Sequence, residues 1–226
     1  MLPGLITIKQ PPAKRAAKAE GGVEKHLTEA AVMLAYAFYL SKSDQSLDRV
    51  EIHRDGEHGK QFDIRSWLET QGFSLVQPEG STSYGGEYSD GRRFVHVSLK
   101  PGLGDVVAET DAYRTVAECK GGIVNSKHAG QKSRLRRGLC EAVGLLISRP
   151  RNDERQFAVV PQTGDARILA ARMYDRCKLA GIGIRLVGGD GAISEVGALN
   201  NALDRTPGSM AVLRGGPMSG AGQDRR

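Results

Sequence analysis

The order of apolar segments between residues 105 and 187 most restricts what this chain can fold into. Alternating and buried-type patterns predict strands at 105–110, 113–120, 157–160 and 182–187, and helices at 129–147 and 165–179. The first two strands are separated only by Asp111-Ala112, which is typical of a tight hairpin turn. A hairpin followed by alternating helices and strands predicts an α/β fold with a mixed central β-sheet flanked by helices.

The remaining elements are expected on both sides of this stretch. We expect helices at 23–41 and 63–71, strands at 4–9, 50–53, 73–76, 93–99 and 192–196, and a long loop at 77–91. The strand at 93–99 and the hairpin then form three meandering strands. The domain organisation that follows is an N-terminal strand and linker at 1–22, a single domain at 23–206 with an inserted or specificity region at about 42–91, and a flexible C-terminal tail at 207–226.

Composition excludes several classes of protein. The 226 residues carry a formal net charge of +6 and a sequence pI of about 9.3, which is compatible with a polyanionic partner. Cys119, Cys140 and Cys177 are odd in number and far apart, so neither a disulfide framework nor a zinc site is expected. No segment has the length of a membrane span or the layout of a signal peptide. We therefore expect a cytoplasmic protein without a membrane partner.

Positive charge is concentrated in one helix and its exit loop. Between Lys127 and Arg155 there are eight Lys or Arg against three acidic residues. Five of these cations lie near the helix start, where basic side chains oppose the helix dipole: Lys127, Lys132, Arg134, Arg136 and Arg137. Such a cluster can hold a phosphate backbone, although a solvated basic face would show the same pattern.

The hairpin register brings charged residues together. With a two-residue turn, Thr110 faces Tyr113 and Asp105 faces Glu118, whose Cβ atoms would then be about 5 Å apart. Lys120 lies two residues beyond Glu118 and points to the same side. Two carboxylates so placed can bind one Mg²⁺, which keeps several of its waters. The alternative is a solvated ion pair at the end of a hairpin.

These residues resemble a known signature. Gly104-Asp105 followed by Glu118-Cys119-Lys120-Gly121-Gly122 is similar to the motif of the PD-(D/E)XK nuclease superfamily, which has the restriction-endonuclease-like fold. The resemblance implies a core of helix, three strands, helix and strand, and covers about half of the chain. It also implies that Asp105 and Glu118 bind Mg²⁺, with Mn²⁺ as a substitute, and that Lys120 is a catalytic base or charge stabiliser. Gly104 departs from the motif, because Pro is usual there.

Two further polar residues are candidates for the same site. Gln131 extends the apolar stripe of its helix toward the expected metal site, and some members of the superfamily carry Gln at a similar place. Many also carry an acid from the first core helix, for which Glu29 is the best placed residue and Glu24 the second. Ordinary alternatives are a helix-start residue bonded to a loop for Gln131 and a solvated helix acid for Glu29.

The function expected from these features is a metal-dependent phosphodiester hydrolase. A DNA endonuclease of the restriction or defence type is favoured over an RNA enzyme by analogy with the superfamily, and two-strand cleavage would favour a homodimer or a partner protein. The main alternative is a catalytically inactive nucleic-acid-binding or assembly module on the same fold. A nucleotide-processing hydrolase is the third hypothesis. An open cleft with converging side chains favours the nuclease, splayed or occluded side chains favour the module, and a closed pocket favours the nucleotide hydrolase.

Overall fold

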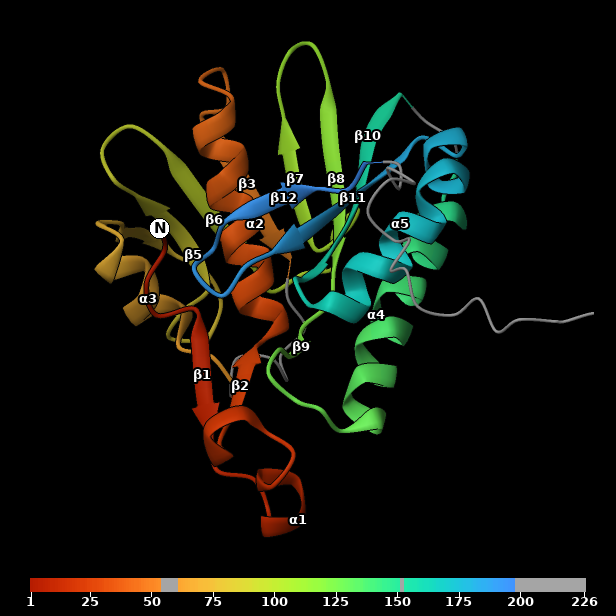
Figure 1. Cartoon of the computed structure of the whole chain (residues 1–226). Helices are drawn as coiled ribbons and strands as arrows, with labels where there is room; N and C mark the ends of the chain where they lie inside the picture. Colours follow the sequence, from red (N-terminus) through yellow and green to blue (C-terminus); the bar gives the residue numbers. More distant parts are fainter. Residues whose placement is uncertain (54–60, 151–152, 198–226) are drawn as a thin grey trace, which may run out of the picture.

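The computed structural model describes residues 1–53, 61–150 and 153–197 as two sheets and their flanking helices (Figure 1). The large sheet has the strand order β12-β11-β10-β8-β7-β3-β6-β5-β4. Its strands are β3 (Arg49–His53), β4 (Ser74–Pro78), β5 (Gly86–Ser89), β6 (Phe94–Ser98), β7 (Val106–Glu109), β8 (Arg114–Cys119), β10 (Glu154–Pro161), β11 (Ile182–Val187) and β12 (Ile193–Glu195). A small sheet of β1 (Ile6–Lys9), β2 (Glu24–Leu27) and β9 (Gly122–Ile123) lies beneath it.

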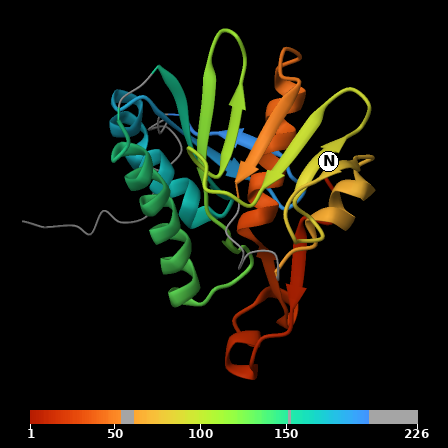
Figure 2. The same cartoon turned by 180° about the vertical axis from the view of Figure 1, so that it is seen from behind.

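Helices pack on both faces of the large sheet. The helices are α1 (Ala13–Ala16), α2 (Glu29–Ser43), α3 (Ile64–Thr70), α4 (Ala129–Ile147) and α5 (Gly164–Leu179), with a short 3₁₀ turn at Glu20–Gly22. α2 and α3 pack on one face, and α4 and α5 pack on the other over β8, β10 and β11. Figure 2 shows that β3, β6, β7 and β8 lie in front of α2, with α4 and α5 to one side. The expected α/β class with a mixed central sheet flanked by helices is confirmed.

α2 begins later than the sequence indicates. A helix is present where 23–41 was expected, but the start at residue 23 is wrong, because residues 24–27 form β2 and pair with β1. Thr28 caps α2, and its hydroxyl accepts a hydrogen bond from the backbone N–H of Ala31 at 3.2 Å. Almost every side chain of α2 is buried, so the helix carries no single apolar stripe whose phase would locate its start.

The central position of β3 is the main topological difference from the expected order. β3 lies between β6 and β7, parallel to the first and antiparallel to the second. The three adjacent strands are therefore β3, β7 and β8, and the expected meander of 93–99 with the hairpin is wrong. Residues 86–89, expected to be loop, form β5 because they pair with both β4 and β6.

The elements that surround the hairpin agree closely with expectation. The β7–β8 pairs, from Val106 opposite Ala117 to Glu109 opposite Arg114, have the register that a two-residue turn predicts. α4 has the bounds expected for it, and β11 spans 182–187. α5 begins at Gly164, one residue before the expected start, because the Thr163 hydroxyl caps it by accepting the N–H of Ala166. The expected tail at 207–226 lies outside the described residues.

Candidate active site and the adjoining cavity

A row of polar side chains crosses three strands at one end of the hairpin. Ile52 pairs with Val106, and Val106 pairs with Ala117. In the same register, the next residues place His53 of β3 opposite Asp105, and Asp105 opposite Glu118. The N–H of His53 donates to the carbonyl of Asp105 at 2.9 Å, which fixes the first of these pairs. The Asp105 Oδ2 accepts the N–H of Cys119 at 2.7 Å, so this carboxylate is anchored to β8. The sheet thus places two carboxylates side by side on the face that α4 covers.

Glu118 is the most perturbed acid of this row. Its side chain is 12% exposed, and its Oε1 lies 3.9 Å from a guanidinium nitrogen of Arg149 at the end of α4. Burial, and after it the neighbouring charge of Asp105, raise the pKa of Glu118 to about 7, while the charges of Lys120 and Arg149 act in the opposite direction. A divalent cation bound between two neighbouring, partly buried carboxylates would offset the repulsion between them.

Lys120 lies between two helices. Its Nζ is 3.7 Å from the Glu29 Oε1 at the start of α2 and 3.5 Å from the Glu141 Oε1 on α4. Burial alone would lower the pKa of Lys120, but the charges of Glu29, Asp105 and Glu141 outweigh it and raise the pKa above its ordinary value. Lys120 therefore carries a positive charge at neutral pH, on the same side of the sheet as Glu118.

Two glycines permit this close packing. A Cβ on Gly121 would lie 2.3 Å from the backbone nitrogen of Glu29, so only glycine lets the end of β8 cross the start of α2. A Cβ on Gly104 would lie 2.7 Å from Val116, which leaves no room for the Pro that is usual in the motif at this position. The departure from the motif thus has a local steric reason.

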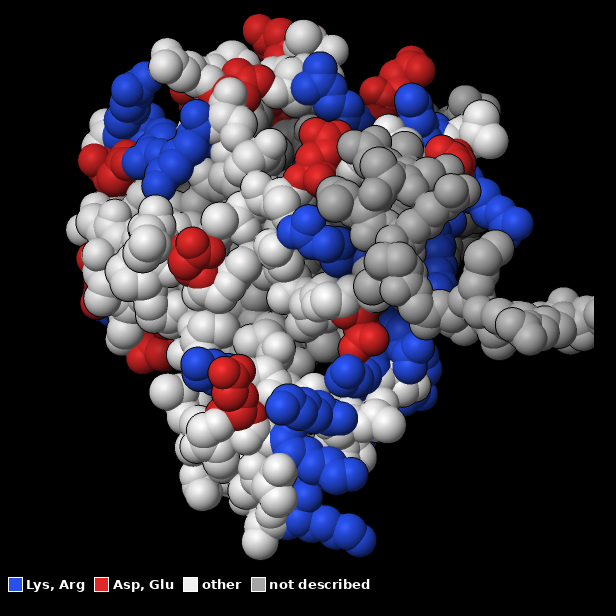
Figure 3. All heavy atoms as spheres, in the orientation of Figure 1, with Lys and Arg blue, Asp and Glu red and all other residues white. Residues whose placement is uncertain are grey.

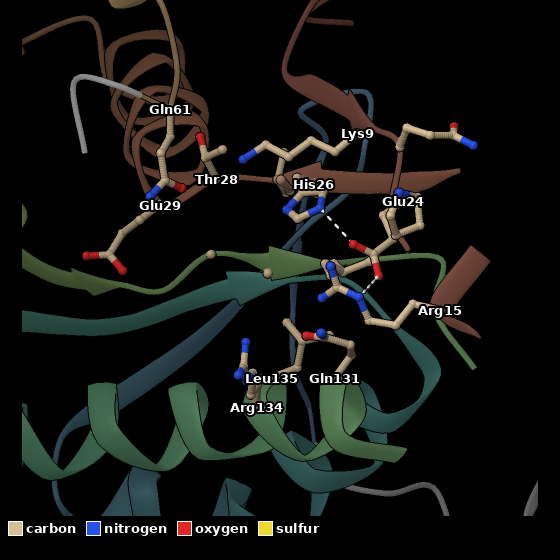
Figure 4. Close-up of a pocket in the computed structure, with 16 residues that line it drawn as sticks. Lys9, Arg15, Glu24, His26, Thr28, Glu29, Gln61, Gln131, Arg134 and Leu135 are labelled. Carbon is tan, nitrogen blue, oxygen red and sulfur yellow. Dashed lines mark hydrogen bonds and ion pairs between the residues drawn. The ribbon is translucent and has the colours of Figure 1, made fainter. Parts of the chain in front are cut away.

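A cavity of about 500 Å³ adjoins the site (Figure 4). Glu29, Gly121 and Gly122 contribute to its wall, as do Gln131 and Arg134 from α4. The opposite wall comes from the small sheet and α1, through Lys9, Arg15, Glu24 and His26. The structure therefore brings Glu29 and Gln131, two of the expected site residues, to one cavity. Asp105, Glu118 and Lys120 are beside this cavity and do not line it.

The basic residues of α4 separate into two groups. Of the five expected phosphate-binding residues, only Arg134 lines the cavity. Lys132 points to α5, where its Nζ lies 3.1 Å from the Asp165 carboxylate. Lys127, Arg136 and Arg137 are exposed. Figure 3 shows Lys and Arg side chains gathered over α1 and the first turns of α4, so the basic surface extends along the lower part of the molecule.

Sequence reasoning missed two residues that contact the site. Glu141 lies on the face of α4 that carries Gln131, Arg134 and Gly138, and helical spacing from Gln131 would have indicated it. Arg149 follows the end of α4 and reaches Glu118 only because the helix runs antiparallel to β8. No pattern in the sequence indicates that contact.

The donor set fits a hard cation with few protein ligands. In the described part of the chain, no group of three or more His, Cys, Asp or Glu is arranged to hold a metal ion. Both ring nitrogens of His53 have other partners, the carbonyl of Lys100 and the carboxylate of Glu51. The carboxylates of this row are those of Asp105 and Glu118, the two expected ligands. Two carboxylates suit Mg²⁺, which prefers oxygen and retains several waters.

Among the helices of residues 1–53, 61–150 and 153–197, none is both long and apolar enough to cross a membrane.

No protein-family model matches the sequence, no curated protein matches it, and no solved structure matches the fold.

Proposed function

We propose that this protein is a Mg²⁺-dependent phosphodiester hydrolase that acts on nucleic acid, with DNA as the preferred substrate. The observation that carries the proposal is the cross-strand pair of Asp105 and Glu118 with Lys120 on the same face. The element order supports it, because α2, the adjacent strands β3, β7 and β8, α4 and β10 follow the order of helix, three strands, helix and strand. That order is the one implied by the resemblance to the PD-(D/E)XK superfamily and its restriction-endonuclease-like fold.

Each side chain has a defined part in this reaction. Asp105 and Glu118 would hold Mg²⁺, with Mn²⁺ as a substitute. The metal ion, when bound, supplies positive charge to the phosphate and lowers the pKa of a water. The hydrogen bond from Cys119 N–H keeps the Asp105 carboxylate in place. Arg149 holds Glu118 from the other side and offsets part of the negative charge of the pair.

Lys120 acts as a charge stabiliser in this proposal. Its raised pKa means that the ammonium group keeps its protons at neutral pH, so it is a poor general base. Glu29 and Glu141 hold the ammonium from two sides at 3.7 Å and 3.5 Å. An ammonium group fixed in this way can stabilise negative charge that develops on the phosphate without rearranging during the reaction.

A cleavage assay tests the proposal. Plasmid, linear duplex, single-stranded DNA and RNA are incubated with Mg²⁺, Mn²⁺ or EDTA, and Lys120→Ala is compared with wild type. Lys25→Ala is the matched control, because Lys25 is an exposed lysine on β2 that does not line the cavity. We expect metal-dependent cleavage that is lost in Lys120→Ala and kept in Lys25→Ala. Equal cleavage by both variants would contradict the proposed role of Lys120.

One observation favours a second candidate, a nucleic-acid-binding or assembly module without activity. Glu118 already has Arg149 as an ionic partner, and Lys120 has Glu29 and Glu141, so the charges of the site can balance one another without a cation. This candidate predicts duplex binding with a steep salt dependence and no cleavage with any metal.

The proposal extends to the cellular compartment and to the assembly of the protein. The cysteines Cys119, Cys140 and Cys177 are free, which supports a reducing compartment such as the cytoplasm. Cleavage of both strands of a duplex would require two active sites, and a homodimer or a partner protein would supply the second.

A further inference from the structure

The cavity beside the site has a cationic wall built from three separate elements. Lys9 comes from β1, Arg15 from α1 and Arg134 from α4, and all three line the same 500 Å³ space. The acids that line it are Glu24 and Glu29, and Glu29 is an ionic partner of Lys120. Burial lowers the pKa of His26, so the positive charge of this wall comes from the lysine and the two arginines. Convergent cations around a concavity are suited to a phosphate group.

A buried carboxylate holds one of these cations in place. The Glu24 side chain is 2% exposed, and its two oxygens lie 3.6 Å from Arg15 Nε and 3.3 Å from His26 Nε2 (Figure 4). The Glu24 Oε1 has no hydrogen-bond partner in the described structure, since 3.6 Å is too long for one. A buried charge that is incompletely satisfied is costly. A phosphate bound to the side of the Arg15 guanidinium that faces away from Glu24 would draw the guanidinium into the cavity. The guanidinium would then be held between two anions, the phosphate and the Glu24 carboxylate.

The cavity is next to the atoms that would do the chemistry. Gly121 and Gly122, which line it, immediately follow Lys120, and Glu29 both lines it and contacts Lys120. A nucleotide bound there would therefore be adjacent to the phosphodiester at the Asp105–Glu118 pair. The volume is within the range of small-molecule sites, so the cavity can hold a group of the size of one nucleotide but cannot enclose a stretch of double helix.

We infer that the cavity binds one unpaired nucleotide of the substrate strand through its phosphate, so that the enzyme acts where a strand leaves the duplex. This inference rests on the proposed function and names its substrate class: DNA with a single-stranded stretch at the cleavage site. Arg15 and Arg134 bind the phosphate, and Glu24 is a positioning residue for Arg15. The apolar residues Ile123 and Leu135 form the part of the wall on which sugar and base rest.

Binding in EDTA tests the inference without cleavage. The probes are a fluorescent single-stranded DNA oligonucleotide and the blunt duplex of the same sequence, titrated with the full chain over a range of salt concentrations. We expect Arg15→Ala and Arg134→Ala each to weaken single-strand binding about tenfold and to reduce its salt slope by about one. Binding of the blunt duplex should change much less, because its ends offer no unpaired nucleotide.

Two matched variants separate this cavity from general basic charge. Lys14→Ala removes the same charge from α1, and Arg172→Ala removes it from an exposed position on α5, but neither residue lines the cavity. Both controls should retain single-strand binding within about twofold of wild type. The inference is overturned if Arg15→Ala and Arg134→Ala weaken binding no more than these controls, or if duplex binding falls equally. Arg134 is exposed on α4, so its variant remains informative even if Arg15→Ala unfolds.

The inference and the proposed function can fail separately. Selective single-strand binding that depends on Arg15 and Arg134, without cleavage under any metal condition, would keep the cavity and reject the hydrolase. Metal-dependent cleavage that requires Lys120, together with single-strand binding that is indifferent to Arg15 and Arg134, would keep the hydrolase and reject the cavity.

Discussion

The two ends of the β7–β8 hairpin use charged residues in opposite ways. At the turn end, Glu109 pairs with Arg114 at 2.8 Å, the Tyr113 hydroxyl donates to Asp44, and the Arg155 guanidinium lies 3.5 Å over the Tyr113 ring. Each of these charged groups has a partner of complementary character. At the other end, Asp105 and Glu118 lie side by side, and burial together with the charge of Asp105 raises the pKa of Glu118 although Lys120 and Arg149 are near.

Two carboxyl groups express this difference in their pKa values. Hydrogen bonds from Ser46 and Tyr113 lower the pKa of Asp44 to about 2. Burial and the charge of Asp105 raise the pKa of Glu118 to about 7. The first arrangement stabilises the charged form in the fold, and the second destabilises it. A carboxyl group kept in an unfavourable state is typical of sites selected for function, although structural networks also perturb pKa values.

The largest expected effect comes from changing one glutamate at each end. Glu118→Gln should lower the rate of metal-dependent cleavage by about 10²–10³, because it removes a metal ligand and a charge. Glu109→Gln, the same substitution on the same hairpin, should leave the rate within about twofold, since Glu109 is exposed and distant from the cavity. Single-turnover rates with saturating enzyme measure both, and equal losses would show that the two ends do not differ in function.

How much of this site was predictable depends on how local each feature is. The facing of Asp105 and Glu118 follows from a two-residue turn, because a short loop sets the register of both strands. The position of Gln131 on the buried stripe of α4 follows from helical spacing. These features depend only on residues close in sequence, and the structure agrees with them.

Features that depend on distant pairing were not predictable. β3 enters between β6 and β7 because of contacts with strands about 50 residues away, and a strand pattern does not indicate its neighbours. The cavity depends on the small sheet, where β9 has only two residues and no periodic signal. Residues 10–22, which composition predicts to be a linker, instead include α1 and supply Arg15 to the cavity wall.

The next effect concerns the close backbone contact between Gly121 and the start of α2 at the site end. Gly121→Ala should lower the free energy of unfolding by about 2–3 kcal/mol, because the new Cβ would press on the backbone at Thr28 and Glu29. Gly144→Ala is the matched control, since nothing lies within 4 Å of its Cβ position in α4. It should stabilise the protein by about 0.5–1 kcal/mol. Urea denaturation measures both, and a neutral Gly121→Ala would mean that β8 and α2 can separate freely.

The smallest effect is a dependence of stability on pH with opposite sign at the two ends. The pKa of Glu118 is raised in the fold, so its contribution to stability is fully present below its unfolded value of 4.5 and is lost as pH rises through about 7. Gln does not ionise, so Glu118→Gln removes this loss of stability at high pH. In EDTA at about pH 8, the variant should be more stable than wild type by about 1 kcal/mol, after allowance for solvent screening, or about 2–4 °C in Tm. Near pH 4 the difference should disappear.

Asp44→Asn is the counterpart at the turn end. The pKa of Asp44 is lowered, so its contribution is present above the unfolded value of 3.8 and is lost as pH falls through about 2. The Asn variant should therefore be less stable than wild type at neutral pH and should approach it in strong acid. Thermal unfolding of the two variants across pH gives both curves. If Glu118→Gln destabilises the protein at alkaline pH as Asp44→Asn does at neutral pH, then Arg149 makes Glu118 an ordinary structural ion pair, and the contrast between the two ends disappears.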